Sequence, residues 1–237
     1  LELVAGRFTA VCGPRARSPM KEKHMKTRRT FLSVLGLSTM VGLSAAFAAP
    51  QASSQPTAPK TAVVGEKAPS FTLEDTTGTS HNLSDFEGKI VVLQWINYKC
   101  PVCVRVSEKT DAVKNMRTKL VEMEPDIVHL ATTSSNSTDA ETTAAYLTKC
   151  EIEIPALMDL DGKVGHLYGA KTTPHMFVID QEGVLRYSGA IDDDPKGSKG
   201  DDAMNYVVNT VSQIKSGSTV TPDKTKPYGC SVKYAKK

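Results

Sequence analysis

The sequence has few of the residues on which metal sites depend. Its 237 residues include five histidines and five cysteines, and the histidines are scattered along the chain. A structural zinc site needs about four Cys or His ligands held close together. The cysteines Cys100 and Cys103 form one C-x-x-C motif. Since there is no second C-x-x-C and no clustered Cys/His pair, we do not expect structural zinc. A metal-binding or metallochaperone protein, with His175 as a ligand beside the cysteines, is the less favoured alternative.

Basic charge is scarce after the first 48 residues. Residues 1–48 hold eight Lys or Arg and two Asp or Glu, whereas residues 49–237 hold 21 Lys or Arg and 24 Asp or Glu. The nominal net charge of +3 therefore describes the N-terminus and not the rest of the chain. Without a basic tract in the remainder, we expect no nucleic-acid partner.

The chain also lacks an apolar run of the roughly 20 residues that cross a membrane as a helix. Its longest such run, SVLGLSTMVGLSAAFA, follows the basic segment MKTRRTFL and ends in the small-residue pattern Ala46-Phe47-Ala48. Residues 25–48 are interpreted as a cleaved signal peptide, and TRRTFL resembles a twin-arginine export signal of bacteria. We therefore expect a periplasmic or otherwise exported protein, with no stable membrane association unless the signal is retained as an anchor.

Residues 1–24 are interpreted as a non-native upstream extension, with Met25 as the initiator, so that Cys12 would be absent from the mature protein. Residues 49–65, rich in Pro, Ala, Ser and Thr, predict a flexible leader. A folded domain is expected over residues 66–216, and a polar C-terminal tail over residues 217–237.

Within the expected domain, strands and helices alternate. Two short strands are expected around Thr77-Gly78, and KIVVLQWI (89–96) is typical of a buried strand. A helix is then expected from Pro101 to about residue 122. The remaining strands are expected at 126–133, 154–159, 175–180 and 184–190, with helices from 137 to about 150, near 162–170 and over 201–215. This order predicts an α/β fold with a central sheet and helices on both faces.

The stretch WINYKCPVCVR carries the chemistry. Pro101 suits the first turn of a helix, where its missing N–H costs nothing. Cys100 then stands at the start of this helix, beside free backbone N–H groups and the positive end of the helix dipole, which lower the pKa of its thiol. Lys99 adds positive charge in the same direction. We therefore predict Cys100 as the attacking, more exposed thiol and Cys103, one turn on, as the buried resolving thiol.

Competing uses of the motif are less consistent with the residues. A c-type haem attachment site would need His after the second cysteine, but residue 104 is Val. A static disulfide across two residues of a helix would be strained. The second informative stretch is AKTTPHMFVID, in which Thr173-Pro174 precedes a strand far from Cys100 in the chain.

Together, C-P-V-C and Thr-Pro before a strand resemble the thioredoxin superfamily, and residues 64–190 resemble its redoxin or peroxiredoxin-like (AhpC/TSA-type) branch. The resemblance implies a thioredoxin-like fold with an N-terminal β-hairpin. It also implies that Pro174 is cis and lies against the C-x-x-C, and that Thr173 offers backbone hydrogen bonds to a substrate segment. His175 is interpreted as a packed strand residue.

Departures from the family patterns favour thiol exchange over peroxide reduction. The peroxidase pattern P-x-x-x-[T/S]-x-x-C would place its cysteine at Cys103, but Ile96 and Cys100 stand where Pro and Thr or Ser belong. The expected arginine near Pro174 is missing, and Arg186 is interpreted as an exposed strand residue. The buried Asp of thioredoxins is replaced by Gln94, which cannot act as a base.

The sequence therefore predicts an exported thiol–disulfide oxidoreductase that exchanges electrons with protein disulfides through Cys100 and Cys103. It needs no cofactor, and its partners are a disulfide or dithiol protein substrate and a redox partner protein. A peroxiredoxin-like thiol peroxidase is the alternative. Cys230 is left with three readings: a free thiol, a disulfide partner of Cys150, or an additional redox cysteine that reaches Cys100.

Overall fold

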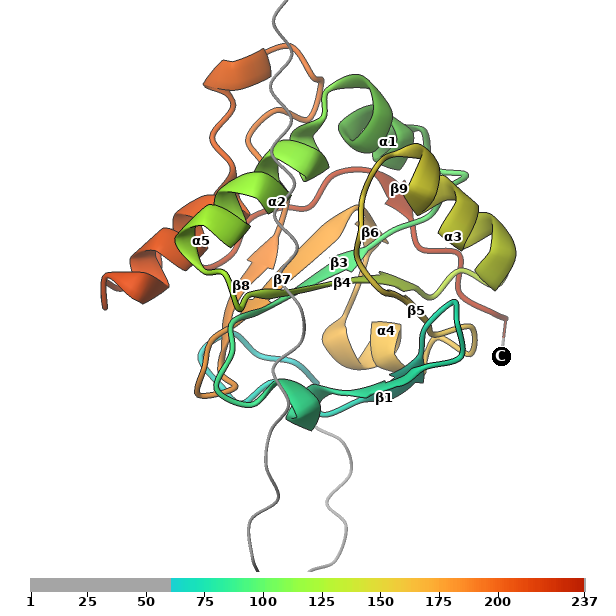
Figure 1. The fold of residues 1–237 in the computed structure, drawn as a ribbon, viewed down its shortest axis with the longest axis horizontal. Helices are drawn as coiled ribbons and strands as arrows, with labels where there is room; N and C mark the ends of the chain where they lie inside the picture. Colours follow the sequence, from blue (N-terminus) through green and yellow to red (C-terminus); the bar gives the residue numbers. More distant parts are fainter. Residues whose placement is uncertain (1–60, 237) are drawn as a thin grey trace, which may run out of the picture. The chain divides into compact units, whose positions relative to one another are not determined.

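The computed structural model describes residues 61–236, which form a five-stranded mixed sheet with helices on both faces (Figure 1). The strand order is β5-β4-β3-β7-β8. The central strands β3, β4 and β5 are parallel, whereas β7 and β8 are antiparallel to their neighbours. The strands are β3 (Val91–Trp95), β4 (Val128–Thr133), β5 (Ala156–Met158), β7 (His175–Ile179) and β8 (Leu185–Gly189). The predicted α/β thioredoxin-like fold is confirmed.

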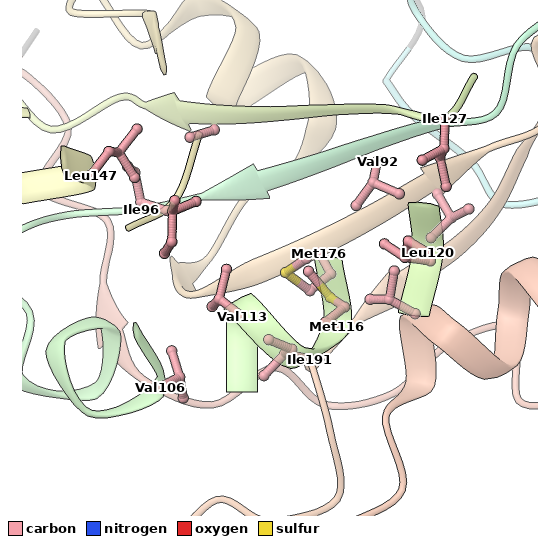
Figure 2. Close-up of a cluster of buried hydrophobic side chains, with 14 of the residues drawn as sticks. Val92, Ile96, Val106, Val113, Met116, Leu120, Ile127, Leu147, Met176 and Ile191 are labelled. Atoms are coloured by element: carbon pink, nitrogen blue, oxygen red, sulfur yellow. The ribbon is translucent and has the colours of Figure 1, made fainter. Parts of the chain in front are cut away.

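Strand β3 is buried on both faces, as its continuous apolar sequence predicts. Successive side chains of a strand point to opposite faces. On one face, Val92 of β3 and Ile96, the residue after the strand, join a core that also holds Met116 and Leu120, as Figure 2 shows. The other face contributes Val91, Leu93 and Trp95 to a second core.

The two faces of the five-stranded sheet are covered by different numbers of helices. Side chains of α2 (Ala112–Met123), α3 (Ala140–Lys149) and α5 (Tyr206–Lys215) reach the first core. The second core is closed by α4 (Lys163–Tyr168) and by residues next to the predicted N-terminal hairpin, which is present as β1 (Thr72–Glu74) and β2 (Ser80–Asn82).

The single helix expected from Pro101 to about residue 122 is instead interrupted. A one-turn α1 (Pro101–Val104) continues into a π-helical turn at Arg105–Lys109, and α2 starts only at Ala112. Between them Asp111 has a left-handed backbone, with φ of 49°. Left-handed residues do not continue a right-handed helix, so the helix expected at Cys100 is only one turn long before its geometry changes.

Both ends of the described chain pack against the domain, which changes two predicted boundaries. Residues 62–65 fall in the predicted flexible leader, but Ala62 N–H donates to Leu167 O at 2.9 Å and Gly65 N–H to Leu185 O at 2.8 Å. At the other end, the predicted tail returns to the sheet edge as β9 (Cys230–Ser231), which pairs with β6 (Thr172–Thr173). The tail therefore belongs to the fold. A two-residue strand leaves no periodicity in the sequence from which it could be predicted.

Across residues 61–236, no helix is long and apolar enough to cross a membrane. The predicted upstream extension, signal peptide and most of the leader fall at positions 1–60, outside the described residues.

Candidate functional site

The candidate site lies where β3 gives way to α1. Cys100 is the N-cap of α1 with an extended backbone, and Pro101 occupies the first turn as predicted. Asn97 shapes the approach: its carbonyl accepts from Cys100 N–H at 2.9 Å, and its side-chain oxygen accepts from Lys99 N–H at 2.8 Å. Asn97 also donates to the hydroxyl of Ser135, just after β4. Asn97 could not be predicted as part of the site, because an Asn before a helix has many uses.

Several hydrogen-bond donors approach the Cys100 sulfur. They lower its pKa to about 4, and the largest cause is a hydrogen bond from the Cys103 thiol, with further ones from Cys230, the Cys103 backbone and Thr173; burial opposes them. Donors stabilise a thiolate over a thiol. The low pKa agrees with the prediction, and its largest cause is a thiol donor that the sequence analysis did not name.

Cys103 is the buried member of the pair, as predicted, with only 1% of its surface exposed. Burial raises its pKa well above the ordinary value, and the Cys100 sulfur raises it further. Cys103 is therefore a thiol while Cys100 is a thiolate. Nearby, burial raises the pKa of the Tyr146 hydroxyl, which lies close to Ser107 and Cys150 and has no hydrogen-bond partner among the described residues. Neither Tyr146 nor Ser107 was identified from the sequence, since both are ordinary helix residues there.

Cys100 is itself closed off from solvent, with 2% of its surface accessible against 1% for Cys103, so the expected difference in exposure is small. The C-terminal segment that carries β9 lies over this end of the sheet, next to β6 (Figure 1). The sequence left Cys230 reaching Cys100 as one of three readings, but it did not predict the strand β9 that carries this residue.

The loop before β7 meets the cysteine pair. The Thr173–Pro174 peptide bond is cis, as the resemblance implied. The Thr173 carbonyl oxygen is 3.0 Å from the Cys100 sulfur, where it accepts from the thiol form. The backbone of β6, which the resemblance assigns to a substrate segment, is occupied by β9 of the same chain. His175 is buried in β7 and accepts from Lys171 N–H, so it packs as expected.

The third cysteine of the site is Cys230, which lies opposite Thr173 in the β6–β9 register. Its thiol is hydrogen-bonded to the Cys100 sulfur. Cys150 has different surroundings, at the end of α3 beside Tyr146, Glu108 and Lys149. All four cysteines of the described residues are free thiols. Of the three readings left open by the sequence, this placement favours the one in which Cys230 reaches Cys100.

Other residues singled out from the sequence lie away from the sulfur atoms. The Lys99 ammonium donates to Ser137 O at 2.6 Å, so its charge is held by a carbonyl and not by Cys100. Gln94 is buried and hydrogen-bonded to His129 at 3.0 Å. Arg186 forms an ion pair with Asp180. Among residues 61–236, no group of three or more His, Cys, Asp or Glu side chains is placed to hold a metal ion.

Comparisons with known proteins agree with the fold. The thiol-disulfide oxidoreductases ResA of Bacillus thuringiensis subsp. konkukian (strain 97-27) and Bacillus cereus (strain ATCC 10987 / NRS 248) are 23% identical to this chain over 124 residues. The matched region is 51% of this chain and 65% of each relative, so just under two thirds of the relatives' length is covered.

Two solved structures resemble the protein over most of their length. A hypothetical protein from Sinorhizobium meliloti 1021 has a TM-score of 0.65 at 22% identity, covering 76% of this chain and 98% of its own. An uncharacterised conserved protein from Geobacillus kaustophilus has a TM-score of 0.62 at 20% identity, covering 74% and 94%. At these identities the likeness shows the fold alone.

The comparison that identifies the family is with a family model. Residues 64–188 match the model of the AhpC/TSA family. The match begins before the N-terminal hairpin and ends in β8, and it contains both Cys100–Cys103 and Thr173-Pro174. Because it spans more than half of the chain, the protein belongs to the AhpC/TSA family, as a redoxin-type member of the thioredoxin superfamily.

Proposed function

We propose that the protein is a thiol–disulfide oxidoreductase that exchanges electrons with protein disulfides through Cys100 and Cys103. The observation that carries the proposal is the ionisation of the pair: Cys100 has a pKa of about 4, whereas burial holds the pKa of Cys103 well above its usual range. At neutral pH one sulfur is a nucleophile and its neighbour is a reserve thiol. The relation to the ResA oxidoreductases supports the same activity.

The reaction takes place in two exchange steps. The Cys100 thiolate attacks one sulfur of a substrate disulfide, so that a mixed disulfide forms and the other substrate sulfur leaves as a thiolate. Cys103 then loses its proton and attacks the Cys100 sulfur, and the second substrate thiolate leaves. Two electrons pass to the substrate and a Cys100–Cys103 disulfide remains. A partner dithiol protein reverses these steps to restore the thiols. The low pKa of Cys100 favours its role as leaving group in that return.

A protein-disulfide assay with matched cysteine variants tests the proposal. The full chain with Cys12→Ser should reduce insulin disulfides in the presence of dithiothreitol, and Cys100→Ser should abolish the activity. Cys150→Ser is the control, because Cys150 is also a buried free cysteine but lies beside Tyr146 instead of Thr173. Equal activity of the Cys100→Ser and Cys150→Ser variants would refute the assignment of Cys100.

The thiol peroxidase alternative predicts a different result with hydrogen peroxide. Its peroxidatic position would be Cys103, which is buried and has a raised pKa. A thiol in that state is a poor nucleophile. We expect stopped-flow oxidation by peroxide to proceed no faster than that of free cysteine in its thiolate form. A much faster reaction, lost in Cys103→Ser, would favour the peroxidase instead.

We also propose that the protein is exported, on the basis of the signal-like segment at residues 25–48. Expression of the chain from Met25 in a bacterium should give a periplasmic product whose first residue is Ala49. A cytoplasmic product that retains residues 25–48 would contradict export.

A further inference from the structure

The C-terminal segment presents a cysteine to Cys100 on a β-strand. Strand β9 pairs antiparallel with β6, and its register sets Cys230 opposite Thr173 and Ser231 opposite Thr172. The carbonyl of that same Thr173 lies 3.0 Å from the Cys100 sulfur. Adding an extended segment to an exposed strand is a common way of binding peptides. The chain thus supplies to its own site a peptide segment with a cysteine at the reacting position.

This segment is fixed on both sides of Cys230. Before it, the Tyr228 hydroxyl hydrogen-bonds to Asp192. After it, Val232 N–H donates to Lys171 O at 3.1 Å, and the Tyr234 hydroxyl donates to Ala170 O at 2.7 Å. Because the backbone is held by contacts before and after Cys230, the structure keeps this cysteine next to Cys100.

Gly229 allows the close approach of this strand. Its backbone has φ of +135°, and a Cβ at this position would lie 2.2 Å from the Thr173 carbonyl oxygen. Glycine is the residue that tolerates both the unusual φ and the contact. The backbone immediately before Cys230 is therefore shaped to bring the strand against Thr173.

The state of the Cys230 thiol depends on Cys100. Burial and the Cys100 sulfur both raise the pKa of Cys230, whereas the backbone N–H of Val102 lowers it. When Cys100 enters a mixed disulfide, its sulfur loses the negative charge. Cys100 then no longer raises the pKa of Cys230 through that charge. Cys230 then becomes easier to ionise at the moment when a resolving thiolate is needed. It is partly exposed, whereas Cys103 is fully buried and loses its proton less readily.

We propose that Cys230 is a third redox-active cysteine, which resolves the mixed disulfide on Cys100 and then passes the bond to Cys103. The proposal rests on the thiol–disulfide exchange assigned to Cys100 above. In the first step Cys230 thiolate attacks the Cys100 sulfur, a Cys100–Cys230 disulfide forms and the substrate thiolate leaves. In the second step Cys103 thiolate attacks the same sulfur, a Cys100–Cys103 disulfide forms and Cys230 leaves as a thiolate that takes up a proton. The substrate gains two electrons, as it does without the relay.

Disulfide mapping in a glutathione buffer tests the relay. The full chain with Cys12→Ser is combined with Cys103→Ser, equilibrated with oxidised and reduced glutathione, quenched with acid and mapped by mass spectrometry. We expect a Cys100–Cys230 disulfide that is absent when Cys230→Ser is added, where Cys100 should carry glutathione instead. Adding Cys150→Ser should change nothing. Any Cys103→Ser product in which Cys100 is a thiol or carries glutathione, without a bond to Cys230, would overturn the proposal.

A time course on the chain with all three site cysteines gives a second readout, which does not depend on how the Cys103→Ser variant folds. After glutathione disulfide is added, the Cys100–Cys230 bond should accumulate first and then be replaced by Cys100–Cys103. If the Cys100–Cys103 bond alone is seen from the earliest quench, the relay is wrong. The Cys230→Ser variant separates the two proposals, because it should still form the Cys100–Cys103 disulfide if the proposed function is right. Failure there would count against the function itself.

Discussion

At the scale of single residues, the low pKa of Cys100 depends chiefly on one donor. The largest cause is the hydrogen bond from Cys103, whose burial keeps its proton in place. Hydrogen bonds to charged groups contribute about 1.5–3 kcal/mol, which corresponds to about 1–2 pH units. The pair therefore acts as a unit, in which each sulfur fixes the proton state of the other.

Replacing Cys103 tests this dependence. Cys103→Ala removes the donor and should raise the pKa of Cys100 by about 1–2 units. Cys103→Ser keeps an O–H donor and should leave it closer to the native value. The pKa is measured as the midpoint of the pH dependence of iodoacetamide labelling at Cys100, followed by peptide mass spectrometry. An identical rise in both variants would show that the donor is not the cause.

Ionisation of Cys100 also makes the stability of the reduced protein depend on pH. Its pKa of about 4 in the folded protein is below the value of about 8.5 for an unfolded cysteine. Unfolding therefore takes up a proton between these values, and this contribution to stability is complete above about pH 8.5 and lost as pH falls toward 4. Between pH 6.5 and 8, urea unfolding under reducing conditions should show a free energy that rises more steeply with pH in the native protein than in Cys100→Ser. Parallel curves would contradict the low pKa.

At the scale of elements, the site is assembled from three short segments. They are the first turn of α1, the two residues of β6 and the two residues of β9. None is long enough to be stable alone, so each is held by the larger elements on either side of it. The close fit between β6 and β9 is the most sensitive contact, because Gly229 leaves no room for a side chain.

Gly229→Ala should displace β9 and separate Cys230 from Cys100. The added Cβ would lie 2.2 Å from Thr173 O. We expect faster alkylation of Cys230 and slower formation of the Cys100–Cys230 disulfide in the Cys103→Ser background. Gly217→Ala is the matched control: its φ of +69° is also positive, but a Cβ there meets nothing within 4 Å. Gly217→Ala should lower the free energy of unfolding by about 1–2 kcal/mol and leave the alkylation rate and disulfide formation of Cys230 unchanged. If both variants label alike, the close approach at Gly229 is not what holds Cys230.

At the scale of the whole molecule, two cores on either side of one sheet hold the site in place. The larger one joins β3 to α2 and α5, and Leu120 is buried in it beside Met116 (Figure 2). Because β3 leads directly into Cys100, the position of the sulfur depends on that packing.

Leu120→Ala should lower the free energy of unfolding by about 2–5 kcal/mol, since it leaves a cavity in the core. The pKa of Cys100 should stay near 4, because the donors around the sulfur remain. Leu160→Ala is the control: Leu160 is 44% exposed and its loss should change stability by no more than about 0.5 kcal/mol. Urea unfolding measures both variants, and equal stabilities would show that Leu120 is not part of a packed core.

The sequence by itself determined the elements of the sheet, the C-x-x-C at a helix start and the Thr-Pro before β7, because these depend on local apolar patterns and short motifs. It did not determine the break at Asp111, since a left-handed residue other than glycine has no strong local signal. The resemblance implied that Thr173-Pro174 lies against the C-x-x-C, 73 positions from Cys100. Only the tertiary structure decided among the readings of Cys230, which it brings to Cys100 across 130 positions of the chain. The physical reason is that a thiol's pKa and accessibility depend on the groups packed around it, and those groups come from segments that the order of residues leaves far apart.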